Sequence, residues 1–156
     1  MRIVAQRVSR AGVSVGAEIV GKIGLGLCIL LGVGSDDTDR ECLWIAEKAA
    51  NLRIFEDPGG RMNRSLLDVG GEALIISQFT LYADCGKGRR PSFTGAAAPG
   101  AAKNLYESFV RRFRDMGITA QTGVFGATMS VDIINEGPVT IILDTADMPD
   151  RRGADI

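Results

Sequence analysis

Two short segments carry most of the groups in this chain that could do chemistry. Residues 77–84 read Ser-Gln-Phe-Thr-Leu-Tyr-Ala-Asp, and residues 135–140 read Asn-Glu-Gly-Pro-Val-Thr. The 156 residues include no histidine, so a mechanism here cannot use an imidazole base. The chemistry must come from hydroxyls, main-chain groups, carboxylates or the substrate itself.

The segment Ser77-Gln78-Phe79-Thr80 follows an apolar run that is typical of a buried strand. At the end of such a strand, main-chain N–H groups and the two hydroxyls could bind an ester carbonyl and stabilise its developing oxyanion. The alternative is that both hydroxyls only satisfy local main-chain groups. Thr80 as a nucleophile would need an activating base, and no imidazole is present to provide one.

The pair Gly137-Pro138 divides two runs that are typical of strands. Both residue types suit a hairpin turn, which is the simplest interpretation. A cis peptide is the second interpretation, although only about 5–6% of X–Pro bonds in folded proteins are cis. In a cis arrangement, the carbonyls of the pair could face the same way and bind an ammonium group.

A basic loop and an aromatic residue between glycines are candidate contacts to RNA. Residues 86–90 read Gly-Lys-Gly-Arg-Arg and could bind phosphates of an RNA end. Phe125 lies in the segment Thr-Gly-Val-Phe-Gly-Ala at 122–127 and could stack on a base. The alternatives are a solvated loop for the first and core packing for the second.

Composition argues against several classes of function. The net charge is −1, from 18 basic and 19 acidic residues, so non-specific binding to polyanions is not expected. Cys28 lies in an apolar run and Cys42 in an expected helix, so both are predicted to be core residues, while Cys85 lies in a polar loop and is expected to be exposed. No C-x-x-C pair is present, so neither a disulfide framework nor a metal site is expected. Gly24-x-Gly26 opens no helix, and we expect no cofactor.

No stretch of the sequence is typical of a membrane span or an export signal. The longest apolar run, residues 25–33, contains glycines and is well short of the roughly 20 residues that cross a bilayer. The first residues lack the apolar core of a signal peptide. These features predict a cytoplasmic protein with no membrane partner.

The hydrophobic pattern predicts a single α/β domain that begins and ends with β-structure. Strands are expected over residues 1–8, 13–15, 18–33 with a glycine break, 52–55, 72–80, 118–122, 130–135 and 139–144. A turn is expected at 9–12 and irregular chain at 61–71. The first third should form antiparallel hairpins.

Two helices should pack against these strands. Thr38 and Glu41 have the spacing of a capping box, so the first helix should begin there and end near Asn51. The second helix should follow Pro99. The predicted buried faces are Leu43, Ala46 and Ala50 on the first helix, and Leu105, Phe109, Phe113 and Met116 on the second.

Two further segments lie outside these elements. Residues 84–100 hold a long loop, and a loop of this length within a small domain is usually functional or mobile. Residues 145–156 are polar, which predicts a frayed tail that follows a domain at 1–144.

The ordered set of segments resembles the D-aminoacyl-tRNA deacylase family. The resemblance covers residues 1–144 and includes the segments 6–8, 32–33, 53–55, 62–63, 77–84, 90–93, 122–129 and 135–140. It implies a homodimeric carboxylic ester hydrolase with three layers of helices and mixed or antiparallel β-sheets. The implied substrate is the ester between a D-amino acid and the 3′ end of tRNA, together with glycine mischarged on tRNA-Ala.

The resemblance also implies roles for individual residues. The Ser-Gln-x-x-Leu segment at 77–81 would line the pocket, and Gly137-Pro138 would be cis and enter the pocket of the other subunit. Its carbonyls would bind the substrate's ammonium group and leave no room for an L side chain, while glycine would pass. Arg7 would brace this pair, and Phe125 and Met129 match positions around the terminal adenine.

An aminoacyl ester is already activated, which suits a chain without histidine. The adjacent ribose 2′-hydroxyl can assist or position water, and main-chain N–H groups near Phe79 and Thr80 would stabilise the oxyanion. Thr80 is then expected to position the substrate and not to be acylated. Two alternatives stay open, an esterase with Thr80 as nucleophile and a non-catalytic module of the same fold that binds an RNA 3′ end.

Overall fold

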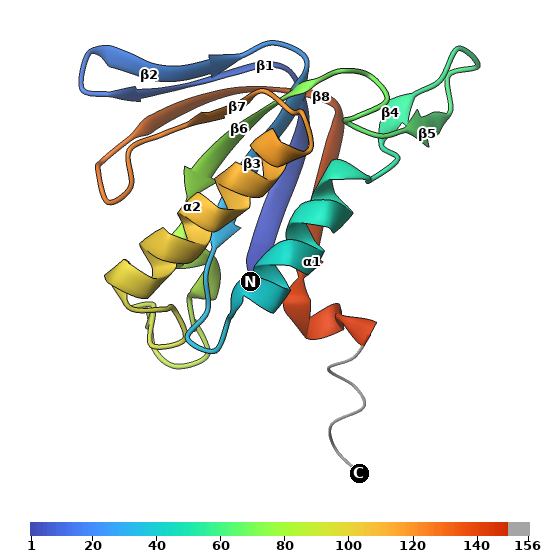
Figure 1. Ribbon diagram of the computed structural model, residues 1–156. Coiled ribbons are helices and arrows are strands. Elements are labelled where there is room, and N and C mark those ends of the chain that lie inside the picture. The colour runs from blue at the N-terminus through green and yellow to red at the C-terminus, as the bar shows by residue number, and fades with distance from the viewer. Residues whose placement is uncertain (150–156) are drawn as a thin grey trace.

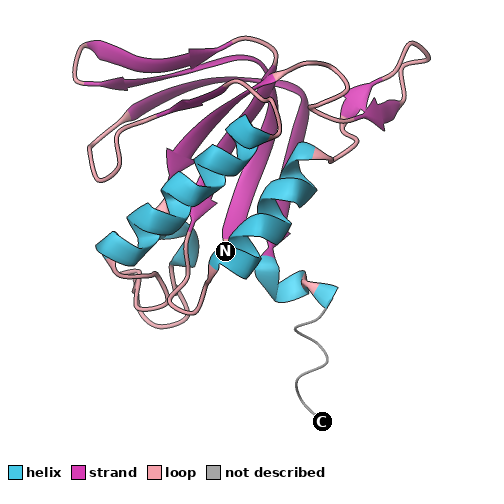
Figure 2. Ribbon diagram, viewed as in Figure 1, coloured by secondary structure: helices cyan, strands magenta, loops and turns pink. Residues whose placement is uncertain are grey.

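A mixed β-sheet organises the computed structural model, which describes residues 1–149 (Figures 1 and 2). Its strands are β1 (Arg2–Val15), β2 (Glu18–Ile23), β3 (Gly26–Gly32), β6 (Glu72–Ser77), β7 (Ala120–Thr122) and β8 (Ser130–Asp144). The short strands β4 (Phe55–Glu56) and β5 (Met62–Arg64) form a separate hairpin. The helices are α1 (Asp39–Ala50) and α2 (Pro99–Asp115), with 3-10 turns η1 (Phe79–Tyr82) and η2 (Thr145–Asp147).

The strand order is β2-β1-β3-β6-β7, and β8 pairs with β1. β1 is antiparallel to β2, β3 and β8, whereas β6 runs parallel to both β3 and β7. The central strands β3 and β6 are buried along most of their length, as expected of parallel strands that are covered on both faces. The sheet is therefore mixed, as the fold prediction states.

Two apolar cores form because successive side chains of a strand point to opposite faces of the sheet. Leu27, Ile29 and Ile75 belong to the larger core, which α1 and α2 cover. Cys28 and Leu74 face the other way into a smaller core with residues of β1 and β2. Figure 1 shows both helices on the same face of the sheet.

Helix α1 confirms the predicted capping box. Thr38 is the N-cap, and its N–H donates to Glu41 Oε2 at 2.9 Å, while its hydroxyl accepts from Arg40 N at 3.3 Å. The predicted buried face is wrong at Leu43, which is 41% exposed. The buried stripe instead runs through Cys42, Ile45, Ala46, Ala49 and Ala50, one position away from Leu43.

Helix α2 begins with Pro99 in its first turn, where the missing N–H has no helical partner to lose. Phe109 and Phe113 are fully buried and stack with ring centroids 4.9 Å apart. Leu105 and Met116 are half-buried and pack against the same core. The predicted apolar face of the second helix is therefore confirmed.

Several predicted boundaries are wrong. β1 continues through residues 9–12, where a turn was expected, because β1 keeps β8 as a partner while its other neighbour changes from β3 to β2. Residues 130–144 form one strand and not a hairpin, since both halves pair with β1. The strand expected at 72–80 ends at Ser77 and turns into η1, and residues 62–64 form β5 within the segment expected to be irregular.

The predicted tail is partly ordered. Residues 145–147 form η2, and Thr145 and Met148 are 1% and 7% exposed, so the tail does not fray at residue 145. Residues 150–156 lie outside the described part of the chain. Cys28 and Cys42 are buried and Cys85 is exposed, as predicted. Within residues 1–149, no helix is long and apolar enough to span a membrane.

Candidate functional site

A cavity of about 580 Å³ lies where the carboxyl ends of β3 and β6 meet the start of α2. This volume is in the range of small-molecule sites. Five of the predicted residues contribute to its wall: Ser77, Gln78, Phe79, Phe125 and Met129. The remaining wall includes Phe93, Tyr106 and the small residues Ala96, Ala97 and Ala127. Segments that are distant in the sequence therefore meet at one site.

Aromatic rings form much of this wall. Phe79 meets Phe93 edge to face, with ring centroids 5.0 Å apart, and Tyr106 lies 5.8 Å from Phe125. The Tyr106 hydroxyl donates to Ile75 O at 2.7 Å, and burial raises the pKa of Tyr106 to about 12. Tyr106 is therefore neutral near pH 7, and its hydroxyl is not available as a general base.

The turn after β6 presents two main-chain donors. The chain leaves the sheet at Ser77, and the N–H of Gln78 donates to Leu31 O at 2.8 Å. Phe79 and Thr80 are the first residues of η1, where N–H groups have no partner in the turn itself. Within residues 1–149, no acceptor is found for either N–H group. A pair of such donors can stabilise an oxyanion.

The hydroxyls of this segment lack a base. The Gln78 side-chain amide donates to Thr80 Oγ1, and Thr80 is exposed and does not contribute to the cavity wall. Ser77 is half-buried on the wall. The wall, as described within residues 1–149, includes no lysine, arginine or carboxylate side chain. The arrangement suits the binding of an ester that is already reactive. It does not supply an activated nucleophile for an unreactive ester.

The Gly137-Pro138 pair lies in β8 and outside the wall of this cavity. Its peptide bond is cis, both residues are exposed, and Gly137 has a φ of +115°. The cis interpretation is confirmed, and the hairpin interpretation is wrong. The pair is thus exposed on the protomer and does not line the cavity of its own chain.

Arg7 and Asn135 hold the strand on both sides of the pair. Arg7 is 6% exposed and donates to Ile54 O at 2.7 Å and to Glu136 O at 3.3 Å. Asn135 Nδ2 donates to Arg7 O at 3.0 Å and to Val139 O at 2.9 Å. The structure therefore brings Arg7 next to the pair, where the resemblance puts it.

A model of the D-Tyr-tRNA(Tyr) deacylase family matches residues 4–144. The chain belongs to this family. All nine predicted site residues fall within the matched residues. Two further members of the wall, Phe93 and Tyr106, were missed by sequence analysis. Tyr106 precedes the predicted Phe109 by one helical turn, and that spacing could have identified it as part of the buried face of α2.

Curated relatives of this chain are named as deacylases, like the family. The chain is 59% identical to a D-aminoacyl-tRNA deacylase of Roseiflexus sp. (strain RS-1), over 94% of both chains. It is 53% identical to a D-aminoacyl-tRNA deacylase of Thermus aquaticus, over 97% of this chain and 100% of the relative.

Two solved structures share the fold. The c-Myc DNA Unwinding Element Binding Protein is 42% identical, with a TM-score of 0.87 over 92% of this chain and 98% of that chain. A probable eukaryotic D-amino acid tRNA deacylase is 21% identical, with a TM-score of 0.81 over the same shares. At that identity, the second likeness concerns the fold alone.

Proposed function

We propose that this chain hydrolyses the ester bond of D-aminoacyl-tRNA and releases a D-amino acid and free tRNA. Membership of the deacylase family and relatives with that name at 53–59% identity support this function. The observation that carries it is the pair of main-chain N–H groups at Phe79 and Thr80, which have no acceptor within residues 1–149. Phe79 lines an apolar cavity, and Thr80 follows it in η1.

In this mechanism, the ester carbonyl lies against the start of η1. Water adds to the carbonyl carbon, and the N–H groups of Phe79 and Thr80 stabilise the oxyanion. The bond to the ribose 3′ oxygen then breaks, and that oxygen takes a proton. The ribose 2′-hydroxyl assists or positions the water, because the wall, in the part of the chain that the structure describes, includes no basic side chain. Phe125 and Met129 contact the terminal adenine.

Chiral selection belongs to the same proposal. Gly137-Pro138 of one protomer enters the cavity of its partner in a homodimer with three-layer packing. The exposure of both residues, and their position outside the cavity of their own chain, support this arrangement. The carbonyls bind the substrate's ammonium group, and the rigid main chain excludes an L side chain. Glycine has no side chain, so glycine mischarged on tRNA-Ala is also cleaved.

Hydrolysis of D-tyrosyl-tRNA and L-tyrosyl-tRNA by the purified chain tests the activity. We expect rapid release of tyrosine from the D ester and a rate near that of buffer for the L ester. Binding of both esters without turnover would favour the RNA-end module. A trapped acyl group on Thr80 would favour the threonine esterase.

Subunit complementation tests the shared site. One variant carries Gly137→Ala with Pro138→Ala, and the other fills the cavity with Ala127→Trp. Each should be inactive alone. In randomly mixed two-fold dimers, about a quarter of the sites combine both intact halves, so about a quarter of the activity should return. If dimers that are shown to contain both variants recover no activity, both halves of a site lie in one chain and the shared site is wrong.

A further inference from the structure

A basic loop adjoins the cavity and has no part in the ester chemistry. Residues 85–91 include Lys87, Arg89 and Arg90, and all of these residues are exposed. Within residues 1–149, no hydrogen bond or ion pair involves any of the three cationic side chains. The three charges are thus open to an external partner.

The base of the loop is a defined piece of structure. Asp84 and Ser92 form an antiparallel bridge, with N···O distances of 2.7 and 2.9 Å between their main chains. Asp84 Oδ1 accepts from Gly86 N at 2.9 Å, which turns the only carboxylate of this segment toward the main chain. The tip of the loop therefore carries three positive charges within a protein of net charge −1.

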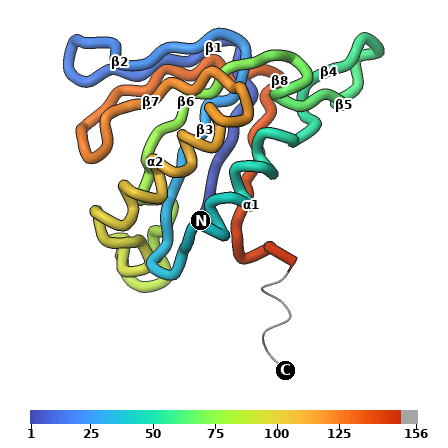
Figure 3. The backbone as a smooth tube through the Cα atoms, in the orientation of Figure 1, coloured from blue at the N-terminus to red at the C-terminus, as the bar shows by residue number. Residues whose placement is uncertain are grey.

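The loop leads directly into the wall of the cavity. Phe93 follows the bridge residue Ser92, lines the cavity and packs against Phe79. The next residues are tied to the end of β3 and the residues after it, since Ala97 N donates to Val33 O at 2.9 Å and Ser35 N donates to Gly95 O at 3.1 Å. Figure 3 shows this segment beside the start of α2.

The reach of the loop sets what it can contact. Gly88 is four residues from each member of the bridge, so the tip lies within about 14 Å of Ser92. A nucleotide whose base and ribose occupy the cavity is linked to preceding phosphates that must lie outside it. Arginine and lysine bind phosphates without reading the base, which suits an enzyme that acts on many tRNA ends.

We propose that Lys87, Arg89 and Arg90 bind backbone phosphates of the nucleotides that precede the terminal adenosine of the substrate. This inference rests on the proposed deacylase function. Because the three residues are remote from the ester, they should stabilise the bound substrate and the transition state to the same extent. Their loss should raise KM and leave kcat unchanged.

The test compares two substrates of the full chain, D-tyrosyl-tRNA and 3′-O-(D-tyrosyl)adenosine, which has no phosphate. For the variant Lys87→Ala/Arg89→Ala/Arg90→Ala, kcat/KM on the tRNA should fall about ten- to hundred-fold at low salt. The slope of log(kcat/KM) against log[salt] should become less steep by about 2, as three single-strand phosphate contacts require. Hydrolysis of the adenosine ester should be unchanged.

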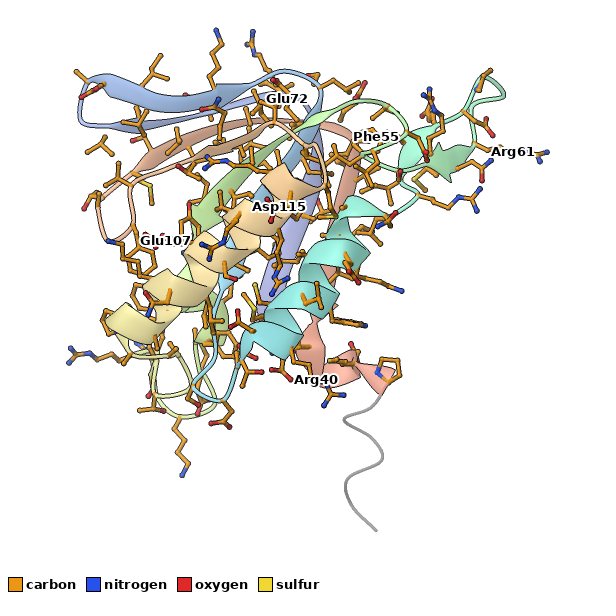
Figure 4. All side chains as sticks on the ribbon, in the orientation of Figure 1. Arg40, Phe55, Arg61, Glu72, Glu107 and Asp115 are labelled. Carbon is orange, nitrogen blue, oxygen red and sulfur yellow. The ribbon has the colours of Figure 1, made fainter. Side chains whose placement is uncertain are left out.

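Two controls separate charge from structure. The variant Lys22→Ala/Lys48→Ala/Arg61→Ala removes the same charge from exposed positions outside the cavity wall, and Arg61 lies at the distant β4–β5 hairpin (Figure 4). Its activity should match that of the parent. The variant Arg89→Lys/Arg90→Lys keeps the charge and should retain most of the activity on tRNA.

The outcomes distinguish the two proposals. An equal loss on both substrates, or no loss on either, would overturn the role of the loop in phosphate binding. A loss in the charge-matched control as large as that in the loop variant would also overturn it. Failure of the unaltered protein to cleave D-tyrosyl-tRNA at all would instead reject the deacylase function.

Discussion

The cavity at the end of β6 and the Gly137-Pro138 segment of β8 differ in almost every physical respect. The cavity is concave and lined by aromatic and small side chains that rest on the larger core. The β8 segment is exposed, and what it presents is main chain. In the proposed homodimer, each protomer supplies a pocket and a separate presenting element, and the two meet through a second copy.

The two regions are also held by different forces. Packing of apolar surface fixes the cavity, and this stabilisation is non-directional. Hydrogen bonds from Arg7 and Asn135 fix the β8 segment, and these depend on the position of individual atoms. Substitutions in the cavity should therefore change turnover, whereas those around β8 should change both turnover and selectivity.

The largest effect is expected for Phe79→Pro, compared with Phe79→Ala. Both variants lose the ring, but only proline also removes the main-chain N–H. Proline is tolerated at the first position of a helical turn, so η1 should persist. The proline variant should have a kcat about 100- to 1000-fold below that of the alanine variant. Equal single-turnover rate constants for the two variants would exclude this N–H as an oxyanion donor.

Gly137→Ala should have the next largest effect. A Cβ at this position would lie 2.9 Å from Val139 Cγ2 and 3.0 Å from Arg7 Nη2, at a φ of +115° that disfavours L side chains. The two side chains must move, and the strained φ favours a shift of the main chain and its carbonyls. A displacement of about 1 Å can cost roughly 100-fold in rate. The matched control is Gly60→Ala, at a φ of +75° in open space, which should keep full activity in the same D-tyrosyl-tRNA assay.

Arg7→Met should lower both stability and selectivity. It removes the donors to Ile54 O and Glu136 O, and hydrogen bonds from a charged group contribute about 1.5–3 kcal/mol each. We expect a free energy of unfolding lower by about 3–6 kcal/mol in urea titrations, and a smaller ratio of D to L hydrolysis. Arg10→Met, at an exposed position of the same strand, is the control and should change neither.

Thr80→Ala should have the smallest effect. The hydroxyl of Thr80 accepts from the Gln78 amide, and no other hydrogen bond of this hydroxyl is found among residues 1–149, so we expect a loss below about ten-fold in kcat/KM. Rapid quenching of the parent with labelled D-tyrosyl-tRNA should yield no acyl-protein. Abolished turnover in the variant, together with a trapped acyl-enzyme in the parent, would establish Thr80 as the nucleophile.

The sequence predicted local structure well where the signal is local. The capping box of α1 and the apolar face of α2 depend on residues a few positions apart, and both are confirmed. The course of β1 and β8 depends on partners more than a hundred residues away, such as Arg2 with Asp144. For that reason, the turns expected at 9–12 and at Gly137-Pro138 were wrong.

The candidate site divides in a similar way. Motif resemblance placed Ser77, Phe125 and Met129 at one site, and the structure brings them to one cavity. The wall residues Phe93 and Tyr106 were not assigned to the site, because neither the segment 90–93 nor the helical spacing of Tyr106 indicates which cavity the ring lines. Only the packing of α2 and the loop before it onto the sheet shows where they lie.

The neutral lining of the cavity has a consequence for the response to acidity. Its one titratable side chain within the described residues, Tyr106, loses its proton only far above neutrality. The lining of the cavity therefore keeps the same charge from mildly acidic to mildly alkaline solution. A change of slope in the pH–rate profile over that interval is therefore not expected from a side chain of the cavity lining, and we expect it to come from the amine of the bound ester.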